Sequence, residues 1–221
     1  MTASRRIGLI HATPVAIEPI RDALSSAWPE ADAVNILEDS LSPDRARSTE
    51  LTPAMYERIA DLARYAHKIG ADAILFTCSA FGAAIESAAA SFDIPVLKPN
   101  EAMFEEAIKS GRNNAMIATF GPAKDGMEAE FAEEAARLDP QARLTSYVVE
   151  DAMTALRSGD VNTHNRLVAE KAASLQGYDA IVLAHFSTAR AAAAVRASVG
   201  IPVLTSPDAA VRKLRRLVGV D

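Results

Sequence analysis

The chain has 221 residues and a formal net charge of −6, with 49% apolar and 24% charged residues. This balance is typical of a globular protein with an apolar core, and the acidic charge excludes the basic face that a general nucleic-acid binder needs. No stretch reaches the roughly 20 apolar residues of a membrane span, and the apolar run at residues 7–10 is too short for a signal sequence. We therefore expect a cytoplasmic protein with no nucleic-acid or membrane partner.

The first half of the chain alternates short apolar runs with amphipathic segments, which predicts parallel strands covered by helices. Thr52 and Pro53 are typical of a helix start, and Gly70 and Gly111 of helix ends. Between the second strand and Thr52 we expect a long polar loop that includes Arg45, Arg47 and Glu50 and that could close over a ligand cleft or simply lie at the surface. The predicted strands are 7–11, 33–37, 72–77 and 95–97, and the predicted helices are 16–27, 52–69, 81–92 and 100–110.

The second half shows the same alternation. Ser206 and Pro207 look like an N-cap followed by a first-turn proline and so predict the start of the last helix, and Gly200 marks the end of the helix before it. The predicted strands are 114–119, 144–149, 180–184 and 202–204, and the predicted helices are 123–138, 151–157, 161–175, 188–199 and 206–218.

The two halves are related by an internal repeat. Residues 72–85 (DAILFTCSAFGAAI) match residues 179–192 (DAIVLAHFSTARAA) at an offset of 179 − 72 = 107, and the match continues through the two IPVL segments at the same offset. The repeat predicts an α/β protein built from two pseudo-symmetric halves with parallel sheets. We expect one half at 1–98, joined by the C-terminal helix 206–221, the other at 99–205, and the ligand site in a cleft between them.

Cys78 is the only cysteine, so it forms no internal disulfide. It follows the apolar run AILFT at the predicted carboxyl end of a strand, where ligands collect in open α/β sheets. Amides of a helix beginning at Ser79 and Ala80 would bind an anion there and lower the pKa of the thiol. The alternative is a buried structural cysteine.

His185 is the repeat equivalent of Cys78, because 185 − 107 = 78. It follows the apolar run AIVLA, and a pseudo-dyad would bring the two side chains to one cleft from opposite sides. A thiolate and an imidazolium would stabilise each other there, and proton-transfer groups on opposite faces of a carbon suit inversion of a stereocentre. The alternative is a histidine that only hydrogen-bonds the backbone.

Further candidates surround these two at the predicted strand ends, where hydroxyls and helix-start amides hold carboxylates, although each also has the ordinary role of a helix cap or of packing. They are Thr13, Thr77, Ser79, Ala80, Thr119, Phe120, Phe186, Ser187 and Thr188. We expect Lys98 at the surface and His67 and His164 as solvated helix residues, and His11 ends the first strand. No glycine-rich nucleotide motif and no metal-ligand spacing occurs, so we expect neither cofactor nor metal.

The segments GADAILFTCSAFG (70–82) and IPVLKPNEAM (94–103), with their echoes at 179–189 and 201–210, resemble the aspartate/glutamate/hydantoin racemase superfamily. Maleate isomerases and arylmalonate decarboxylases form branches of it. The resemblance implies two flavodoxin-like halves and cofactor-independent proton chemistry next to a carboxylate or related carbonyl. Family racemases carry one cysteine in each half. Cys78 matches the first, whereas His185 stands at the place of the second.

Three functions stay open. We favour a racemase or isomerase of a small carboxylate-bearing substrate such as an amino acid, hydantoin or dicarboxylate, with Cys78 and His185 as its acid and base. An enzyme resembling arylmalonate decarboxylase or maleate isomerase would use Cys78 as proton donor or nucleophile. A non-catalytic carboxylate-binding protein is the third possibility. For an enzyme of this size we expect a homo-oligomer, a dimer or larger.

Overall fold

The computed structural model describes residues 4–121 and 124–220. The chain divides into two compact units. Unit 1 comprises Met1–Pro99 and Ala210–Asp221, and unit 2 comprises Asn100–Ala209. Within the described ranges, no helix combines the length and the apolar character that crossing a membrane requires.

Unit 1 contains a parallel sheet with the strand order β2-β1-β3-β4. Helices pack on the sheet, so strand side chains are buried: Ile10 and Ile74 join Ile59 and Ile85 of two covering helices in one core. Ile7, which points to the opposite face of the sheet by strand alternation, is fully buried as well. The strands are β1 (Arg6–His11), β2 (Asp32–Leu37), β3 (Ala73–Phe76) and β4 (Val96–Leu97). The helices are α1 (Ile17–Ala27), α2 (Leu41–Ala46), α3 (Pro53–Lys68) and α4 (Gly82–Ala89), with short 3-10 turns η1 (Pro14–Ala16) and η2 (Ser79–Phe81).

Unit 2 contains a second parallel sheet with the order β6-β5-β7-β8. Its strands are β5 (Asn113–Ala118), β6 (Arg143–Val148), β7 (Ala180–Leu183) and β8 (Val203–Thr205). Its helices are α5 (Glu101–Ser110), α6 (Lys124–Leu138), α7 (Glu150–Arg157), α8 (Val161–Ala173), α9 (His185–Thr188) and α10 (Ala192–Ser198), with the 3-10 turn η4 (Ala189–Ala191). The last helix, α11 (Ser206–Leu217), begins in unit 2 and continues into unit 1.

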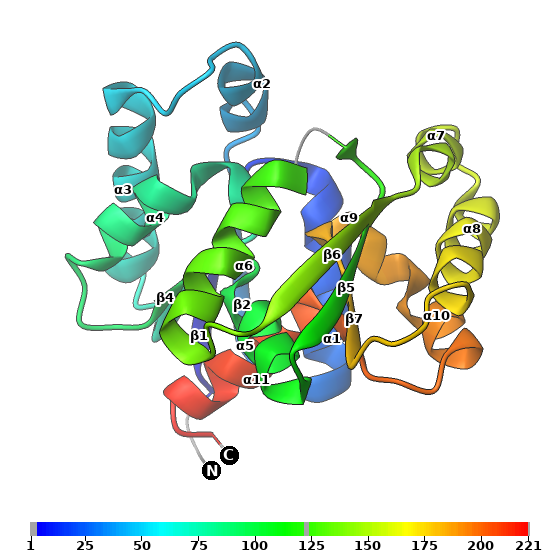
Figure 1. Ribbon diagram of the computed structural model, residues 1–221. Coiled ribbons are helices and arrows are strands. Elements are labelled where there is room, and N and C mark those ends of the chain that lie inside the picture. The colour runs from blue at the N-terminus through cyan, green and yellow to red at the C-terminus, as the bar shows by residue number, and fades with distance from the viewer. Residues whose placement is uncertain (1–3, 122–123, 221) are drawn as a thin grey trace. The chain divides into compact units, whose positions relative to one another are not determined.

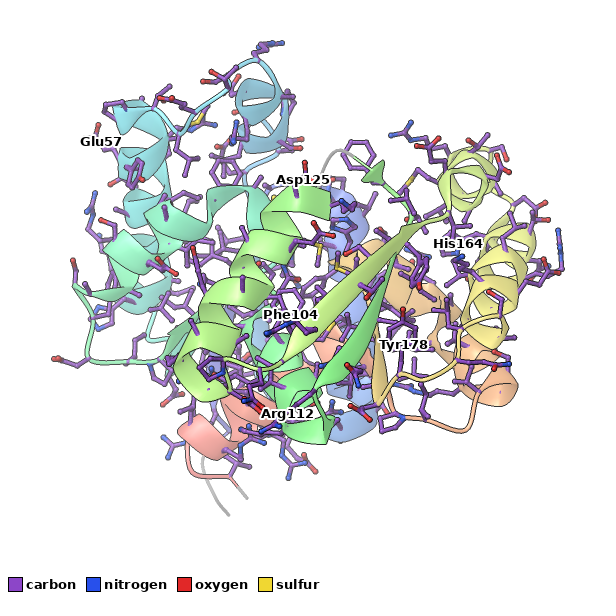
Figure 2. The ribbon with its side chains drawn as sticks, in the orientation of Figure 1. Glu57, Phe104, Arg112, Asp125, His164 and Tyr178 are labelled. Atoms are coloured by element: carbon purple, nitrogen blue, oxygen red, sulfur yellow. The ribbon has the colours of Figure 1, made fainter. Side chains whose placement is uncertain are left out.

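Alternating side chains of β5 and β7 supply two separate cores on the two faces of the unit 2 sheet. Met116 and Val182 pack with α5 and α6, including Phe104, whereas Ile117 and Ile181 pack with α7, α8 and α10. Figure 1 shows these two helix layers on opposite sides of the sheet. Phe104 and Tyr178, labelled in Figure 2, pack in the first core and against the second core. The predicted α/β class, with two parallel sheets, is confirmed.

The repeat is visible in the strand register of each unit. Ile7 pairs with Ala73 in unit 1, and Asn114 pairs with Ala180 in unit 2, so both partners move by the same offset (114 − 7 = 180 − 73 = 107). A polar contact repeats as well. The Asp72 carboxylate accepts a hydrogen bond from the Arg6 amide at 2.7 Å, and the Asp179 carboxylate accepts one from the Asn113 amide at 2.8 Å. The sequence duplication is therefore also a duplication of backbone geometry.

Several predictions of local structure were wrong. The polar segment after β2 contains the helix α2, which Leu41 anchors with 1% exposure. The helix predicted at 188–199 is three short pieces that begin at His185. The last helix is capped by Thr205, whose hydroxyl accepts the Asp208 amide, rather than by Ser206. The Thr52 cap of α3 is confirmed, because its hydroxyl accepts the Met55 amide.

Two charged or titratable side chains expected in solvent are buried. Lys98, after β4, is 8% exposed and pairs with the Glu86 carboxylate. His164, on α8 in Figure 2, is fully buried, because positions 164, 168 and 172 form the inward face of that helix. His67 is exposed, as expected.

Candidate functional site

Cys78 lies at the carboxyl end of β3, where the chain passes from the strand into η2. It is half-buried, its backbone is extended (φ −122°, ψ 119°), and the Ala80 amide is near enough to its sulfur to lower the pKa of the thiol. Burial raises the pKa of the thiol, and this outweighs the lowering by the Ala80 amide and by the positive charge of Arg45. The expected depressed pKa is therefore wrong: η2 is a three-residue turn, too short to supply a helix dipole, and the resting group is a protonated thiol.

Arg45 of α2 reaches the same strand end from the side. Its Nε donates to the carbonyl oxygen of Ala80 at 3.2 Å, and its Nη1 donates to that of Ser48 at 2.5 Å. The guanidinium thus binds the backbone two residues after Cys78, and its positive charge acts on the thiol. The sequence placed Arg45 in a polar loop. The structure shows that this segment forms the helix α2 and that Arg45 contacts the turn after β3.

Arg58 of α3 holds α2 in place. Its guanidinium donates to the Asp44 carboxylate and to the Ser40 hydroxyl, each at 2.7 Å, and also pairs with Glu38. Partial burial alone would raise the pKa of Glu38, but the hydrogen bonds from Ser40 and Arg58 and the charge of Arg58 together lower it. The segment that carries Arg45 is therefore held by this charge network together with one buried apolar side chain, Leu41.

Replacing Arg58 with methionine is expected to destabilise the protein by about 1 kcal/mol at pH 7, because it removes the partly buried ion pairs with Asp44 and Glu38. The lowered pKa of Glu38 means that its contribution is present above the ordinary carboxyl pKa and is lost as the pH falls through the folded-state pKa. The difference in urea unfolding free energy between wild type and Arg58→Met should therefore shrink in acid, below about pH 4. Arg64→Met, on the same helix with an exposed partner, is the matched control. A difference between wild type and Arg58→Met that is independent of pH would contradict this account.

The remaining unit 1 candidates lie at two neighbouring strand ends. Thr77 is buried, and its hydroxyl lies 2.9 Å from Nδ1 of His11, which ends β1. Ser79 is half-buried and Ala80 exposed. Thr13 is half-buried at the start of η1, where its side chain makes no capping hydrogen bond. The structure thus gathers Thr77, Cys78, Ser79 and Ala80 around one turn.

His185 occupies the equivalent turn after β7, and its backbone is in the left-handed region (φ 68°). Side chains other than glycine rarely adopt this conformation, and where it occurs it often marks functional turns. Among the described residues, no group hydrogen-bonds its buried Nε2. Burial lowers the pKa of His185 to about 4, so the imidazole is neutral at physiological pH. The expected thiolate–imidazolium pair is therefore replaced by a neutral thiol and a neutral imidazole.

The other unit 2 candidates surround His185 or end β5. The hydroxyls of Thr119 and Thr188 lie 3.3 Å apart and are both buried, so they tie the end of β5 to α9. Phe186 is buried, and Ser187 is half-buried. Phe120 is 39% exposed, and the Arg157 guanidinium of α7 lies 5.9 Å from its ring centroid. Sequence reasoning missed Arg157, because nothing in the sequence places α7 over Phe120.

The structure places Cys78 and His185 at equivalent turns of their own units, at the offset 185 − 78 = 107. That the two turns serve one cleft stays a prediction. Among the described residues, no group of three or more His, Cys, Asp or Glu side chains is arranged to hold a metal ion.

Comparisons with known proteins agree with this geometry. The Asp/Glu/Hydantoin racemase family profile matches residues 7–214, whereas no curated protein sequence matches. An allantoin racemase from Klebsiella pneumoniae has a similar fold, with a TM-score of 0.75 at 18% identity, over 98% of this chain and 89% of that one. A glutamate racemase isoform from Bacillus anthracis gives a TM-score of 0.71 at 13% identity, over 100% of this chain and 84% of that one.

An arylmalonate decarboxylase mutant in its sulfate-associated form also has this fold. Its TM-score is 0.65 at 20% identity, over 97% of this chain and 93% of that one. At these identities the similar structures show the fold alone. The family profile, in contrast, matches nearly the whole sequence. This chain therefore belongs to the Asp/Glu/hydantoin racemase family.

Proposed function

We propose that this chain is a cofactor-independent racemase or isomerase that moves a proton at the carbon next to a carboxylate or related carbonyl of a small substrate. The observation that carries the proposal is the duplicated turn: each unit ends its third strand on one proton-transfer residue, Cys78 after β3 and His185 after β7. Two such groups on opposite faces of one carbon are what inversion of a stereocentre needs.

The protonation states assign directions to the two groups. A neutral imidazole accepts a proton, and a neutral thiol donates one. In the resting enzyme His185 therefore removes the substrate proton from one face, and Cys78 delivers a proton to the other. This turnover leaves an imidazolium and a thiolate, and the opposite enantiomer is processed by that charged form. A bound carboxylate raises the pKa of His185 above its value in the empty site, which improves it as a base.

The remaining groups at the turns suit the anionic parts of such a substrate. The Arg45 guanidinium beside the Cys78 turn has the charge and the fork geometry to bind a carboxylate. Amides and hydroxyls at Ser79, Ser187 and Phe186 are placed at turn starts, where they stabilise a developing enolate. The substrate class we propose is thus a small carboxylate, hydantoin or amino acid.

One-sided chemistry is the second candidate, and the raised pKa of Cys78 favours it. A protonated thiol alone suffices to deliver a proton to the carbanion that a decarboxylation leaves, and His185 then has no proton to transfer. In this version Cys78 is the acid, and the Arg45 side chain still holds the remaining carboxylate.

The deciding experiment incubates the protein in D₂O with single enantiomers of amino acids and hydantoins, and with malonates and dicarboxylates, chosen first by thermal shift. Racemisation is expected to give both enantiomers with deuterium at the reacting carbon, measured by NMR and chiral chromatography. Release of CO₂ with one deuterated product would support the decarboxylase version. Ligand-induced thermal shifts without exchange for any compound would overturn both and leave a binding protein.

A further inference from the structure

His11 is a buried titratable residue that the proposed reaction does not use. It ends β1, is 0% exposed, and both of its ring nitrogens are engaged. Nε2 lies 2.9 Å from Oδ1 of Asn35 on β2, and Nδ1 lies 2.9 Å from the Thr77 hydroxyl at the end of β3. One imidazole therefore links the end of β1 to Asn35 within β2 and to Thr77 just after β3, which are three adjacent strands.

The direction of these bonds follows from the partners. An amide oxygen only accepts, so Nε2 of His11 carries the proton and donates it to Asn35. Nδ1 then accepts the Thr77 hydroxyl proton at 2.9 Å, and the longer contact of that hydroxyl with the Ile10 carbonyl, at 3.3 Å, shares the same proton. Burial lowers the pKa of His11, which keeps this neutral arrangement at physiological pH.

Thr77 is the last residue before Cys78 and is fixed to β1 twice. Its amide donates to the carbonyl of Ile10 at 3.0 Å, and its hydroxyl contacts both that carbonyl and His11. The extended backbone of Cys78 follows directly, with the Ala80 amide near its sulfur. The position of the thiol therefore depends on how firmly Thr77 is held.

Unit 2 provides an internal comparison. At the offset of 107, Ala118 stands for His11 and Ala184 for Thr77, so the side-chain network is missing there. The backbone bond is kept, since the Ala184 amide donates to Ile117 at 2.9 Å. After it the chain turns into the left-handed region at His185, whereas Cys78 stays extended. The hydrogen bond between His11 and Thr77 thus occurs in the unit that carries the cysteine and has the extended turn, and it is missing in the unit with the left-handed turn.

We propose that His11, acting through the Thr77 hydroxyl, is a positioning residue for Cys78 that holds the β3 turn so that the Ala80 amide reaches the sulfur. The positioning role matters for catalysis only if the proposed function holds, but testing it requires no substrate. Cys78 is the only cysteine in the sequence, so thiol labelling reports on it alone. The charged group that acts on the thiol among the described residues of unit 1 is Arg45, and it stays unchanged in every variant.

The experiment measures the rate of iodoacetamide labelling of the full chain from pH 6 to 10. Thr77→Val and His11→Leu are each expected to raise the labelling pKa and slow the reaction at pH 7 by about fivefold, the effect of one lost hydrogen bond. The double variant should match the single ones, because both remove the same link. Thr77→Ser keeps the hydroxyl and should restore the wild-type profile, and His67→Gln, exposed on α3, is the matched control.

Wild-type labelling pKa values in folded Thr77→Val would overturn the proposal, even if His11→Leu fails to fold. Additive effects in the double variant would also overturn it, since they would mean independent roles. The outcomes for the proposed function are separate. If the variants shift the labelling pKa but the wild-type protein turns over no substrate, the positioning role stands and the proposed reaction is rejected. If the wild-type protein turns over a substrate but the variants leave the labelling pKa unchanged, the reaction stands and the positioning role is rejected.

Discussion

Cys78→Ala is expected to abolish most proton transfer to the substrate, with a loss of at least about a hundredfold in turnover, while the protein stays folded. The thiol is the acid of the proposed reaction, and positioned acids and bases contribute about 10² to 10⁴ in rate. The side chain is small and half-buried, so its truncation should change the unfolding free energy by no more than about 1 kcal/mol. Turnover and urea unfolding are the two measurements.

Cys78→Ser should be almost as inactive, because a hydroxyl is a far weaker acid than a thiol. A chemical control uses the wild-type protein: a reversible methanethiosulfonate block of the single cysteine should remove activity, and a reductant should restore it. Substantial turnover in both Cys78→Ala and Cys78→Ser would return this residue to a structural role.

His185→Ala should separate exchange from interconversion. With only Cys78 left, interconversion of enantiomers should fall at least about a hundredfold, while one enantiomer still exchanges its proton with D₂O. This exchange uses the thiolate as base, and the raised pKa of Cys78 means that its rate should increase as the pH rises toward that pKa. Deuterium incorporation into each enantiomer, followed by NMR, is the measurement.

The left-handed backbone at His185 supplies a matched pair of variants. Glycine adopts this conformation without a steric cost, so His185→Gly should be about 1 kcal/mol more stable than His185→Ala, although both lack the imidazole. Equal stability would mean that the turn relaxes once the imidazole is gone. Unchanged interconversion in both variants would refute the two-base reaction and favour one-sided chemistry.

The repeat made most of the fold predictable. Short apolar runs that alternate with amphipathic helices are typical of buried parallel sheets, and a constant offset shows which runs correspond. The helix α2 was missed because it has a single buried apolar anchor, Leu41, and depends on Arg58 from another helix. Two errors had readable signals: His164 shares an i, i+4 face with Val168, and Thr205 with Asp208 has the spacing of a helix cap.

The candidate site was predictable in residue type but not in charge state. The place of Cys78 and His185 after apolar strands follows from the sequence. Their protonation depends on how far packing removes water, and the left-handed turn at His185 depends on tertiary contacts. The link from His11 to Thr77 was equally hidden, since it joins residues 66 positions apart.

The way the chain is shared between the units has a consequence for its biosynthesis. Unit 2 is one continuous segment, whereas unit 1 is completed by residues after Ala209, with Arg215 of α11 donating to the Ala27 carbonyl at the end of α1. From Pro99 to Ala210 the ribosome adds 210 − 99 = 111 residues. At about 5–20 residues per second this takes roughly 5–20 s. During that time unit 1 lacks the residues after Ala209, including Val211 and Leu214, which are fully buried in the complete chain, and chaperones have their best opportunity to bind the unfinished unit.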